Sequence, residues 1–178
     1  NANCSNCNSN SDTESTGSVT ASDCKCIAGY EGDAAANTCA ECDKGTYKSA
    51  LANAACTNCV TNAITTDKGS TAITACLCDK GYGGDATDGT GCAECSLGYW
   101  KDDKLNTACS QCGALASTLN TASNNKNKCL CSPGAEGDAS DGSSDCTACD
   151  KGKYKDSLAN NANCSNCNSN SDTESTGS

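Results

Sequence analysis

The sequence contains no Phe, Met, His or Arg, and only one Pro and one Trp in 178 residues. Large apolar side chains are also scarce, since Ile, Leu and Val together number 13 and the aromatic residues six. Burying one Leu or Phe contributes about 1.5–3 kcal/mol, whereas ordering each residue costs about 1–2 kcal/mol in backbone entropy. So few apolar side chains cannot offset that cost, and a conventional hydrophobic core is excluded.

The absences also exclude several classes of function. Without His and Arg, acid–base and nucleophilic catalysis lack their usual groups, so we expect no enzyme and no cofactor. A net charge of −10, with Lys as the only base, disfavours binding to nucleic acid or to an anionic membrane face. No run is long and apolar enough to span a bilayer, and we expect no membrane contact within this segment.

Cysteine takes the place of the missing apolar residues. The chain has 20 cysteines, above the roughly 8–10 % that marks a disulfide scaffold. All of them follow one scheme of Cys-x-Cys, a glycine-rich loop and Cys-x-x-Cys, with further Cys-x-x-Cys pairs between the copies, and the clearest copy runs from Cys76 to Cys95. Such frameworks belong to oxidising compartments, which predicts an extracellular or cell-surface protein.

The chain is a tandem array. Residues 161–178 are identical to residues 1–18, which indicates a super-repeat of 160 residues. Within it, cysteine-rich repeats cover residues 4–55, 56–108 and 109–163, and residues 164–178 begin the next copy. Periods of this size are typical of linear arrays in which each unit contacts its neighbours. We therefore expect an extended rod or fibril whose partners are neighbouring copies of the same repeat protein.

Local patterns predict short β-hairpins. No stretch shows a convincing helical period, and Asp88-Gly89 and Asp141-Gly142 are typical hairpin turns. The predicted fold class is therefore small, disulfide-rich and mostly irregular, with short hairpins in an array of cysteine-rich repeats. One aromatic ring per repeat follows a glycine, at Tyr47, Trp100 and Tyr154. We interpret these rings as packing plugs at repeat junctions, and a stacking platform for sugars is the alternative.

The cysteine frame resembles that of EGF-like modules, especially laminin-type EGF modules and the cysteine-rich ectodomain repeats of growth-factor and ephrin receptors. Cys-x-x-Gly-Tyr-x-Gly at residues 26–32 and 78–84 carries the similarity, and the third repeat departs from it with Ala135. The resemblance implies nine bridges: Cys7–Cys24, Cys26–Cys39, Cys42–Cys56, Cys59–Cys76, Cys78–Cys92, Cys95–Cys109, Cys112–Cys129, Cys131–Cys146 and Cys149–Cys164. Each would contribute about 3 kcal/mol by restricting the unfolded chain.

Two cysteines remain under this pairing. Cys4 is the copy of Cys164, and Cys167 is the copy of Cys7, so we expect inter-copy disulfides to the preceding and following copies. The sequence leaves a nested scheme open, for example Cys56–Cys76 with Cys59–Cys78.

Three other chemistries fit less well. Cys39-x-x-Cys42 and Cys56-x-x-Cys59 have a spacing near that of zinc ribbons, but zinc would leave the Cys-x-Cys pairs unused. Redox catalysis needs a thiol of lowered pKa, usually at a helix N-terminus, and no helix is predicted. Paired carboxylates such as Asp85 and Asp88 fit solvated turns better than calcium, because the EF-hand pattern is absent.

Asn3-Cys-Ser and Asn163-Cys-Ser match the N-glycosylation pattern, and the Ser/Thr-rich loops are candidate O-glycosylation sites. The cysteine frame, the Ala/Thr/Ser/Asn/Lys filling and the near-absence of Pro, Arg, Phe and Met resemble ciliate surface proteins of the immobilisation-antigen type. That resemblance implies a secreted surface antigen, usually lipid-anchored. We predict a structural glycoprotein that forms a disulfide-stapled rod or filament of a cell-surface coat. The alternative is a ligand-binding receptor-type ectodomain for a protein or glycan, with Tyr99 and Trp100 as candidate binding residues.

Overall fold

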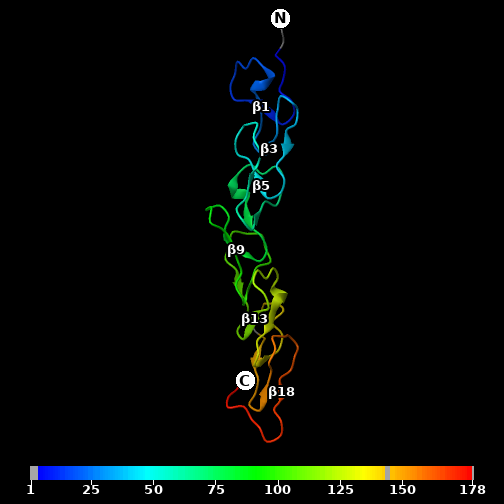
Figure 1. Ribbon diagram of the computed structural model, residues 1–178, viewed down its shortest axis with the longest axis vertical. Helices are drawn as coiled ribbons and strands as arrows, with labels where there is room; N and C mark the ends of the chain where they lie inside the picture. The colour runs from blue at the N-terminus through cyan, green and yellow to red at the C-terminus, as the bar shows by residue number, and fades with distance from the viewer. Residues whose placement is uncertain (1–3, 143–144, 178) are drawn as a thin grey trace. The chain divides into compact units, whose positions relative to one another are not determined.

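The computed structural model describes residues 4–142 and 145–177, and it consists of short strands and loops (Figure 1). The strands pair in two-stranded sheets, and helical structure in the described residues is limited to three short 3-10 turns. The predicted fold class is confirmed in these respects: the chain is disulfide-rich, has almost no helix, and is built from repeated short hairpins.

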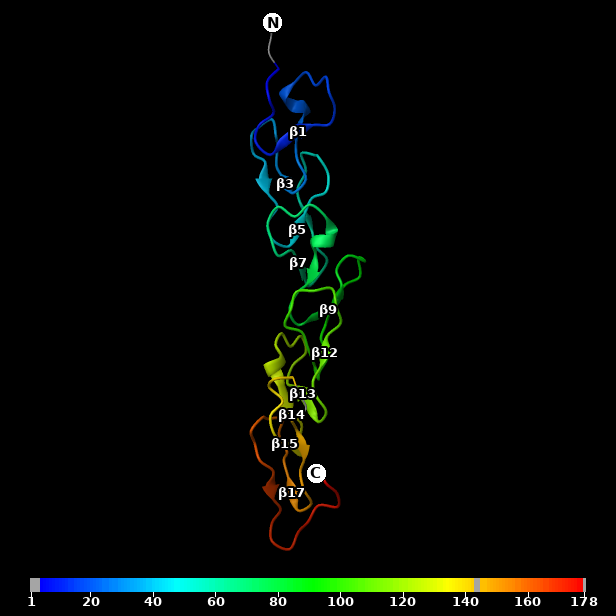
Figure 2. The ribbon, with the colours of Figure 1, turned by 180° about the vertical axis from the view of Figure 1, so that it is seen from behind.

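The chain forms two compact units. The first contains the chain up to Cys78 together with Asp85–Cys92, and the second contains Asp79–Gly84 and the chain from Ala93 onward. Within the first unit, the strands β1 (Ser11–Thr13), β3 (Tyr30–Glu31) and β5 (Thr46–Tyr47) follow one another in chain order (Figure 1). Within the second, β12 (Ser110–Gln111), β13 (Ala116–Thr118), β15 (Ala135–Glu136) and β17 (Lys153–Tyr154) do the same (Figure 2).

Three kinds of bridge-closed loop alternate along the chain, and we call them A, B and C loops. The A loops cover residues 7–24, 59–76 and 112–129, the B loops residues 26–39, 78–92 and 131–146, and the C loops residues 42–56, 95–109 and 149–164. The Cα atoms of each bridged pair lie 5.5–5.8 Å apart. Consecutive loops share a Cys-x-Cys or Cys-x-x-Cys, so each hairpin begins where the previous one ends.

Each loop closes on a short hairpin. The A-loop strands are β1 (Ser11–Thr13) with β2 (Cys24–Cys26), β7 (Ala63–Ile64) with β8 (Leu77–Cys78), and β13 (Ala116–Thr118) with β14 (Cys129–Cys131). The B-loop strands are β3 (Tyr30–Glu31) with β4 (Ala40–Glu41), β15 (Ala135–Glu136) with β16 (Thr147–Ala148), and β9 (Tyr82–Asp85) and β10 (Gly91–Glu94). The C-loop strands are β5 (Thr46–Tyr47) with β6 (Thr57–Asn58), β11 (Tyr99–Trp100) with β12 (Ser110–Gln111), and β17 (Lys153–Tyr154) with β18 (Ser165–Asn166).

The 3-10 turns end the A loops. They are η1 (Ala21–Asp23), η2 (Ile73–Ala75) and η3 (Lys126–Lys128), and each lies directly before the second cysteine of its loop. Asp23 Oδ2 accepts the amides of Val19 and Thr20 at 2.8 and 2.9 Å. These bonds to Thr20 and Val19 hold the pKa of the Asp23 carboxyl below its usual range.

A left-handed residue directly precedes the first strand of every hairpin. The third residue after the first cysteine of each loop has positive φ; it is a glycine in the B and C loops, as at Gly29 (φ 80°) and Gly45 (φ 88°). In the A loops it is Asn10, Asn62 and Leu115, at φ 55–61°. Glycine and, less readily, Asn adopt this conformation without a large steric cost. The spacing from the cysteine therefore sets where the turn before each hairpin lies.

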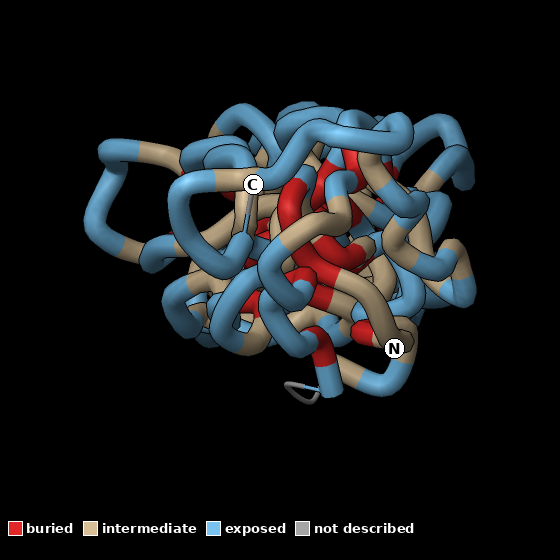
Figure 3. The backbone as a smooth tube through the Cα atoms, turned by 90° about the horizontal axis from the view of Figure 1, so that it is seen from below, coloured by how far each residue is buried: buried red, intermediate tan, exposed pale blue. Residues whose placement is uncertain are grey.

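Cysteine and alanine make up the apolar interior. One cluster contains Cys24, Cys26 and Ala34, and another contains Cys112, Cys129, Cys131, Ala135, Ala139 and Cys146. Buried stretches of the backbone are short and lie inside exposed loops (Figure 3). The cystines therefore fill the space that Leu and Phe fill in an ordinary domain.

Candidate functional site

Each C loop docks against the following A loop, and this junction is the most regular feature of the chain. The first junction covers residues 42–76, the second 95–129 and the third 149–177. Four hydrogen bonds join the first junction: Cys59 N to Gly45 O (2.8 Å), Gly45 N to Thr65 Oγ1 (2.9 Å), Gly69 N to Cys42 O (2.8 Å) and Lys48 N to Ser70 O (3.0 Å). Three of the four bonds use only backbone atoms, so side chains can differ between junctions without changing these bonds.

The same bonds recur in the second unit. The second junction has Cys112 N to Gly98 O (2.8 Å), Gly98 N to Thr118 Oγ1 (3.1 Å), Ala122 N to Cys95 O (2.8 Å) and Lys101 N to Ser123 O (3.0 Å). The third has Cys167 N to Gly152 O (2.8 Å), Gly152 N to Thr173 Oγ1 (3.1 Å) and Gly177 N to Cys149 O (2.8 Å). Thr65 and Thr118 are 1 % and 3 % exposed, because the C-loop glycine covers their hydroxyl groups.

A B loop also reaches each of these A loops through backbone alone. A Cβ on Gly29 would lie 2.3 Å from Gly69 O, and a Cβ on Gly81 would lie 2.4 Å from Ala122 O. Both distances are far inside van der Waals contact, so neither glycine can be replaced without moving backbone. By contrast, a Cβ on Gly45 would meet no atom within 4 Å.

A buried lysine follows the ring in every repeat. Lys48, Lys101 and Lys155 are only 5 %, 3 % and 6 % exposed. Lys48 Nζ donates to the carbonyl oxygens of Cys26 (2.9 Å), Ile27 (3.2 Å) and Tyr30 (2.7 Å). The ammonium group thus occupies a cage of B-loop carbonyls, in which the oxygens of Cys26 and Ile27 also accept the amides of Ala52 and Tyr30.

The other two lysines vary this arrangement. Lys155 Nζ donates to Cys131 O (3.2 Å), Ala135 O (2.5 Å) and Ala159 O (2.8 Å). Lys101 Nζ bonds Asp103, at 3.0 Å to its carbonyl and 3.0 Å to its carboxylate. Loss of hydration lowers the pKa of Lys48 and Lys155, and nearby Glu31 and Glu136 oppose this shift.

An asparagine and a glutamate link the C loop back to the B loop. Asn53 Oδ1 accepts the amides of Cys26 (3.0 Å) and Ala34 (3.2 Å), and Glu31 Oε2 accepts the amide of Cys56 (2.8 Å). Asn160 and Glu136 make the equivalent contacts in the third repeat. The B and C loops are therefore held by polar side chains rather than by apolar packing.

The two residues predicted as a binding patch lie in different surroundings. Trp100 packs against the cysteine–alanine cluster of the third repeat, and its ring approaches Gly142, where a Cβ would lie 3.2 Å from Cζ2. Trp100 Nε1 is buried and has no hydrogen-bond partner in the described residues. Tyr99, its neighbour on β11, is 36 % exposed, as expected from the alternation of side chains along a strand.

The nine disulfides in the structure join the same cysteine pairs that the EGF-like resemblance implied. Cys4 and Cys167 are free thiols; Cys4 is exposed and Cys167 is half-buried. Asn163 of the second glycosylation motif is exposed. Asn3 of the first motif lies outside the described residues.

The paired carboxylates form turns. Asp85 Oδ1 accepts Thr87 N at 2.8 Å, and Asp88 Oδ1 accepts Thr90 N at 2.8 Å, and bonds of this kind lower the pKa of Asp88. Among the described residues, no group of three or more His, Cys, Asp or Glu side chains could hold a metal ion. In the same part of the chain, no helix has the length and apolar character needed to cross a membrane.

The buried lysines were missed from the sequence. The signal was present, because Tyr47-Lys48, Trp100-Lys101 and Tyr154-Lys155 occupy the same place in each repeat. Lys is almost never fully buried unless its charge is paired, so composition alone assigns these residues to the surface. A polar residue that recurs at a fixed distance from a cystine was the clue to a structural role.

Bridged hairpins, backbone junctions and a cysteine interior define a cysteine-rich tandem-repeat protein of the growth-factor-receptor type. The family described as tyrosine-protein kinase ephrin type A/B receptor-like matches residues 29–76, 83–129 and 137–178. These matches cover more than half of the chain, and the chain belongs to this family. Each match contains one whole junction from C loop to A loop. No curated protein matches the sequence.

Proposed function

We propose that the chain is a non-catalytic structural element of a cell-surface coat, in which copies of the repeat form a rod or filament. Tandem repeats of the receptor type fit an extracellular domain. The more specific role in a cell-surface coat is what the resemblance to immobilisation antigens of ciliates implies. Neighbouring copies are the proposed partners, and Asn163 and the Ser/Thr-rich loops are the proposed glycan sites.

One observation carries the proposal: the residues that recur between repeats serve the junctions. The C-loop glycine, the buried lysine and the threonine of the A loop recur, and all three contact the neighbouring loop. Exposed positions vary more: Lys44 recurs as Lys151 but is Leu97 in the second repeat, and Thr66 is replaced by Leu119. A spacer needs units that join alike, whereas a shared ligand site would need exposed residues that recur.

Electron microscopy of the native particle tests the proposal. We expect filaments with a regular axial repeat on the cell surface, and gold-labelled antibodies against this chain should decorate them at that repeat. Discrete globules, or a protein confined inside the cell, would contradict it.

A ligand-binding ectodomain is the second candidate, and one surface of the second unit favours it. Leu97, Tyr99 and Leu119 are 57 %, 36 % and 66 % exposed. A cavity of about 490 Å³ beside Leu119 is lined also by Asn120, Asn127 and Leu130 among others. Glycan-array binding that the double variant L119K/Y99K abolishes, and that the matched double variant T66K/T46K of the first junction leaves intact, would support this role. If no glycan or surface protein binds, the structural role is the only candidate that remains.

A further inference from the structure

The third A loop, residues 112–129, encloses a cavity of its own, which we call the Leu119 cavity. Its volume is about 490 Å³, and it is lined by Leu119, Asn120, Asn124, Asn127, Lys128 and Leu130, among others. Pockets for small ligands have volumes of about 300–1,000 Å³ and combine apolar side chains with a few polar groups. The Leu119 cavity has both properties, and residues of one loop and its second cysteine-bearing strand suffice to form it.

Both arms of this loop are fixed without a ligand. On one arm, Ser123 Oγ donates to Asn120 O at 2.9 Å, and the junction bond from Ala122 holds the same arm to the C loop. On the other arm, Asn125 Oδ1 accepts the amide of Asn127 at 3.0 Å at the start of η3. A bridge closes the loop directly after η3. A ligand therefore meets a cavity that is already shaped, which lowers the entropic cost of binding.

The loop does not use the polar side chains that line the cavity. Asn124, Asn127 and Lys128 are exposed, and their side chains have no hydrogen bond or ion pair among the described residues. Each Asn offers two donors and an acceptor, and the Lys offers three donors. Thr121, also in the lining, instead donates to Glu94 Oε2 at 2.9 Å. These groups suit a ligand that is rich in hydroxyl groups and carries one negative charge.

The cavity lies in the longest part of the chain that has no acidic residue. Residues 104–135 contain three Lys and no Asp or Glu, so they carry +3, whereas the rest of the chain carries −13 of the net charge of −10. Lys104 pairs with Asp79 at 3.7 Å, which leaves Lys126 and Lys128 unpaired among the described residues. A carboxylate is therefore repelled by most of this chain but attracted to this loop.

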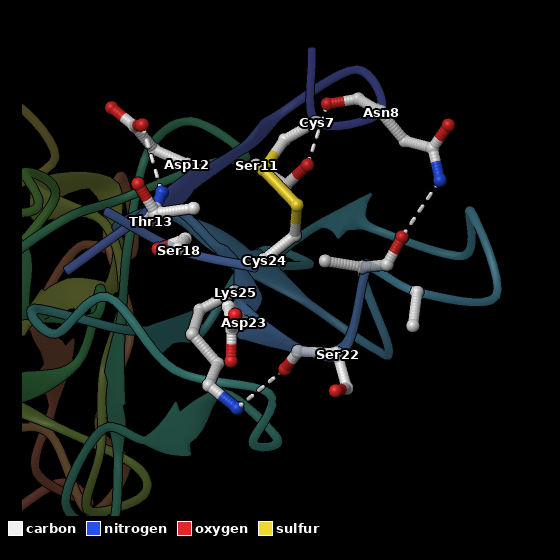
Figure 4. The surroundings of a disulfide bond; sticks show 12 residues. Cys7, Asn8, Ser11, Asp12, Thr13, Ser18, Ser22, Asp23, Cys24 and Lys25 are labelled. Carbon is white, nitrogen blue, oxygen red and sulfur yellow. Dashed lines mark hydrogen bonds between the residues drawn. A yellow bond between two sulfur atoms is a disulfide. The ribbon is translucent and has the colours of Figure 1, made fainter. Parts of the chain in front are cut away.

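The first A loop contains an equivalent cavity with a different lining. This Glu14 cavity, of about 310 Å³, is lined by Glu14, Ser15, Gly17, Ser18, Asp23 and Lys25. Each of these residues lies 105 positions before a residue that lines the Leu119 cavity, the same step that separates the two loops. Glu14 takes the place of Leu119, and Asp23 takes the place of Lys128 directly before the bridged Cys24 (Figure 4). One loop structure thus carries an acidic lining in one copy and an apolar, basic lining in another.

We propose that the Leu119 cavity binds a sugar residue that carries a carboxylate, such as a uronic acid. The carboxylate pairs with Lys128 Nζ, the ring hydroxyl groups bond the amides of Asn124 and Asn127, and the apolar face of the ring packs against Leu119 and Leu130. An acidic peptide fits less well, because most polar groups of the lining are neutral amides. This inference rests on the ligand-binding candidate of the proposed function and names the class of its ligand.

Titration of the isotope-labelled, fully bridged chain tests the proposal by nuclear magnetic resonance. Methyl β-glucuronide is the probe, and methyl β-glucoside is the uncharged control with the same ring. We expect amide shifts at Asn124, Asn127 and Lys128 but not at Asp23. Glucuronide should bind about tenfold more tightly than glucoside, as one hydrogen bond to a charged group predicts. Equal affinity for the two sugars, or equal shifts around both cavities, would overturn the inference.

Two neighbouring lysines provide a matched pair of variants. Lys128→Gln should weaken glucuronide binding about tenfold and leave glucoside binding unchanged. Lys126→Gln removes the same charge from an exposed residue of the same turn and should change either affinity less than about twofold. L119E/K128D gives the cavity two residues of the first A loop and should abolish binding, while nine bridges counted by mass spectrometry show that the variant folds. Losses of equal size in the two single variants would contradict a contact with Lys128.

Two further outcomes distinguish this inference from the proposed function. Binding of neutral glycans alone would keep the ligand-binding role and overturn the acidic sugar as its ligand. An Asp- and Glu-containing tetrapeptide that displaces the glucuronide and binds more tightly would show that the cavity takes an acidic peptide instead. The imaging of filaments is independent of both results, because the cavity is formed within one loop.

Discussion

The first and second junctions have the same backbone conformation, but only the first has residues that favour this conformation. Gly69 and Asn62 hold the left-handed positions of the first junction, at φ 67° and 61°. In the second, Ala122 and Leu115 adopt the same conformation at φ 53° and 55°. The four hydrogen bonds are nevertheless the same in both. The bridges on either side therefore fix the backbone conformation, and residues that favour this conformation only add to its stability.

The two junctions also differ in polar contacts. In the first, Lys68 pairs with Asp43 at 2.7 Å on the exposed side. In the second, Ser96 and Thr121 replace these residues, and Thr121 Oγ1 bonds Glu94 Oε2 at 2.9 Å. Exposed ion pairs contribute little to stability, so we attribute similar junctions to their common backbone bonds and buried lysine. Four sets of variants separate these contributions.

The largest effect should come from Gly29→Ala, because it places a Cβ against Gly69 O and also forces a side chain into positive φ. Overpacking against backbone costs about 1–3 kcal/mol, and the left-handed conformation adds about 1–2 kcal/mol. Native-state hydrogen exchange at the Gly69 amide should show the loss. Gly45→Ala is the control, since its Cβ meets nothing, and should cost only the conformational part. Equal losses in the two variants would refute the close contact.

Replacement of a buried lysine should rank second. Lys48→Met keeps the length of the side chain but leaves three carbonyl oxygens without their ammonium donor. We expect a loss of about 2 kcal/mol, the usual contribution of hydrogen bonds to a charged group. Lys44→Met removes the same charge from an exposed position of the same loop and should have little effect. Exchange rates of the Gly29 and Cys42 amides report the difference, and matching rates in both variants would exclude a role for the cage.

Correction of the left-handed residues should stabilise the second junction. Leu115→Asn and Ala122→Gly each relieve a steric cost of about 1–2 kcal/mol. For Ala122→Gly, the greater conformational freedom of the unfolded chain offsets part of this gain. A net gain of about 1 kcal/mol for Leu115→Asn is expected, because Leu115 is already half-exposed and loses little burial. Asn62→Leu in the first junction should cost a similar amount. Denaturant titrations with the bridges intact measure both, and a loss of stability in Leu115→Asn would count against the argument.

The smallest effect should come from the exposed ion pair. The hydrogen bond and charge of Lys68 lower the pKa of Asp43 below its usual range. A carboxyl with a lowered folded pKa stabilises the fold above its unfolded pKa, and this contribution is lost as the pH falls through the folded pKa. Asp43→Asn should therefore weaken the first junction slightly at neutral pH and not at all in strong acid. The difference in stability between Asp43→Asn and the unchanged chain should shrink in high salt. If Asp43→Asn weakened the second junction by the same amount, the Lys68–Asp43 ion pair would not be the source of the effect.

The sequence determined the covalent framework and its repetition. Twenty cysteines at fixed spacings, with few apolar residues, predict small disulfide-rich hairpins, and the structure confirms that fold class. This succeeded because a cystine restricts its loop whatever the intervening residues are. The positive φ three residues after each opening cysteine follows the same spacing, and the glycines at most of these positions were visible in the sequence.

Tertiary structure alone decided which polar residues are buried. Lys48 resembles Lys44 in the sequence, yet one lies in a cage of carbonyls and the other in solvent. Trp100 and Tyr99 were predicted as one patch, whereas Trp100 packs on the next repeat and Tyr99 is exposed. These outcomes depend on which backbone carbonyls of a neighbouring loop lie within reach and on where that loop lies. Neither is written in the spacing of the cysteines, because both arise only when two bridged loops come into contact.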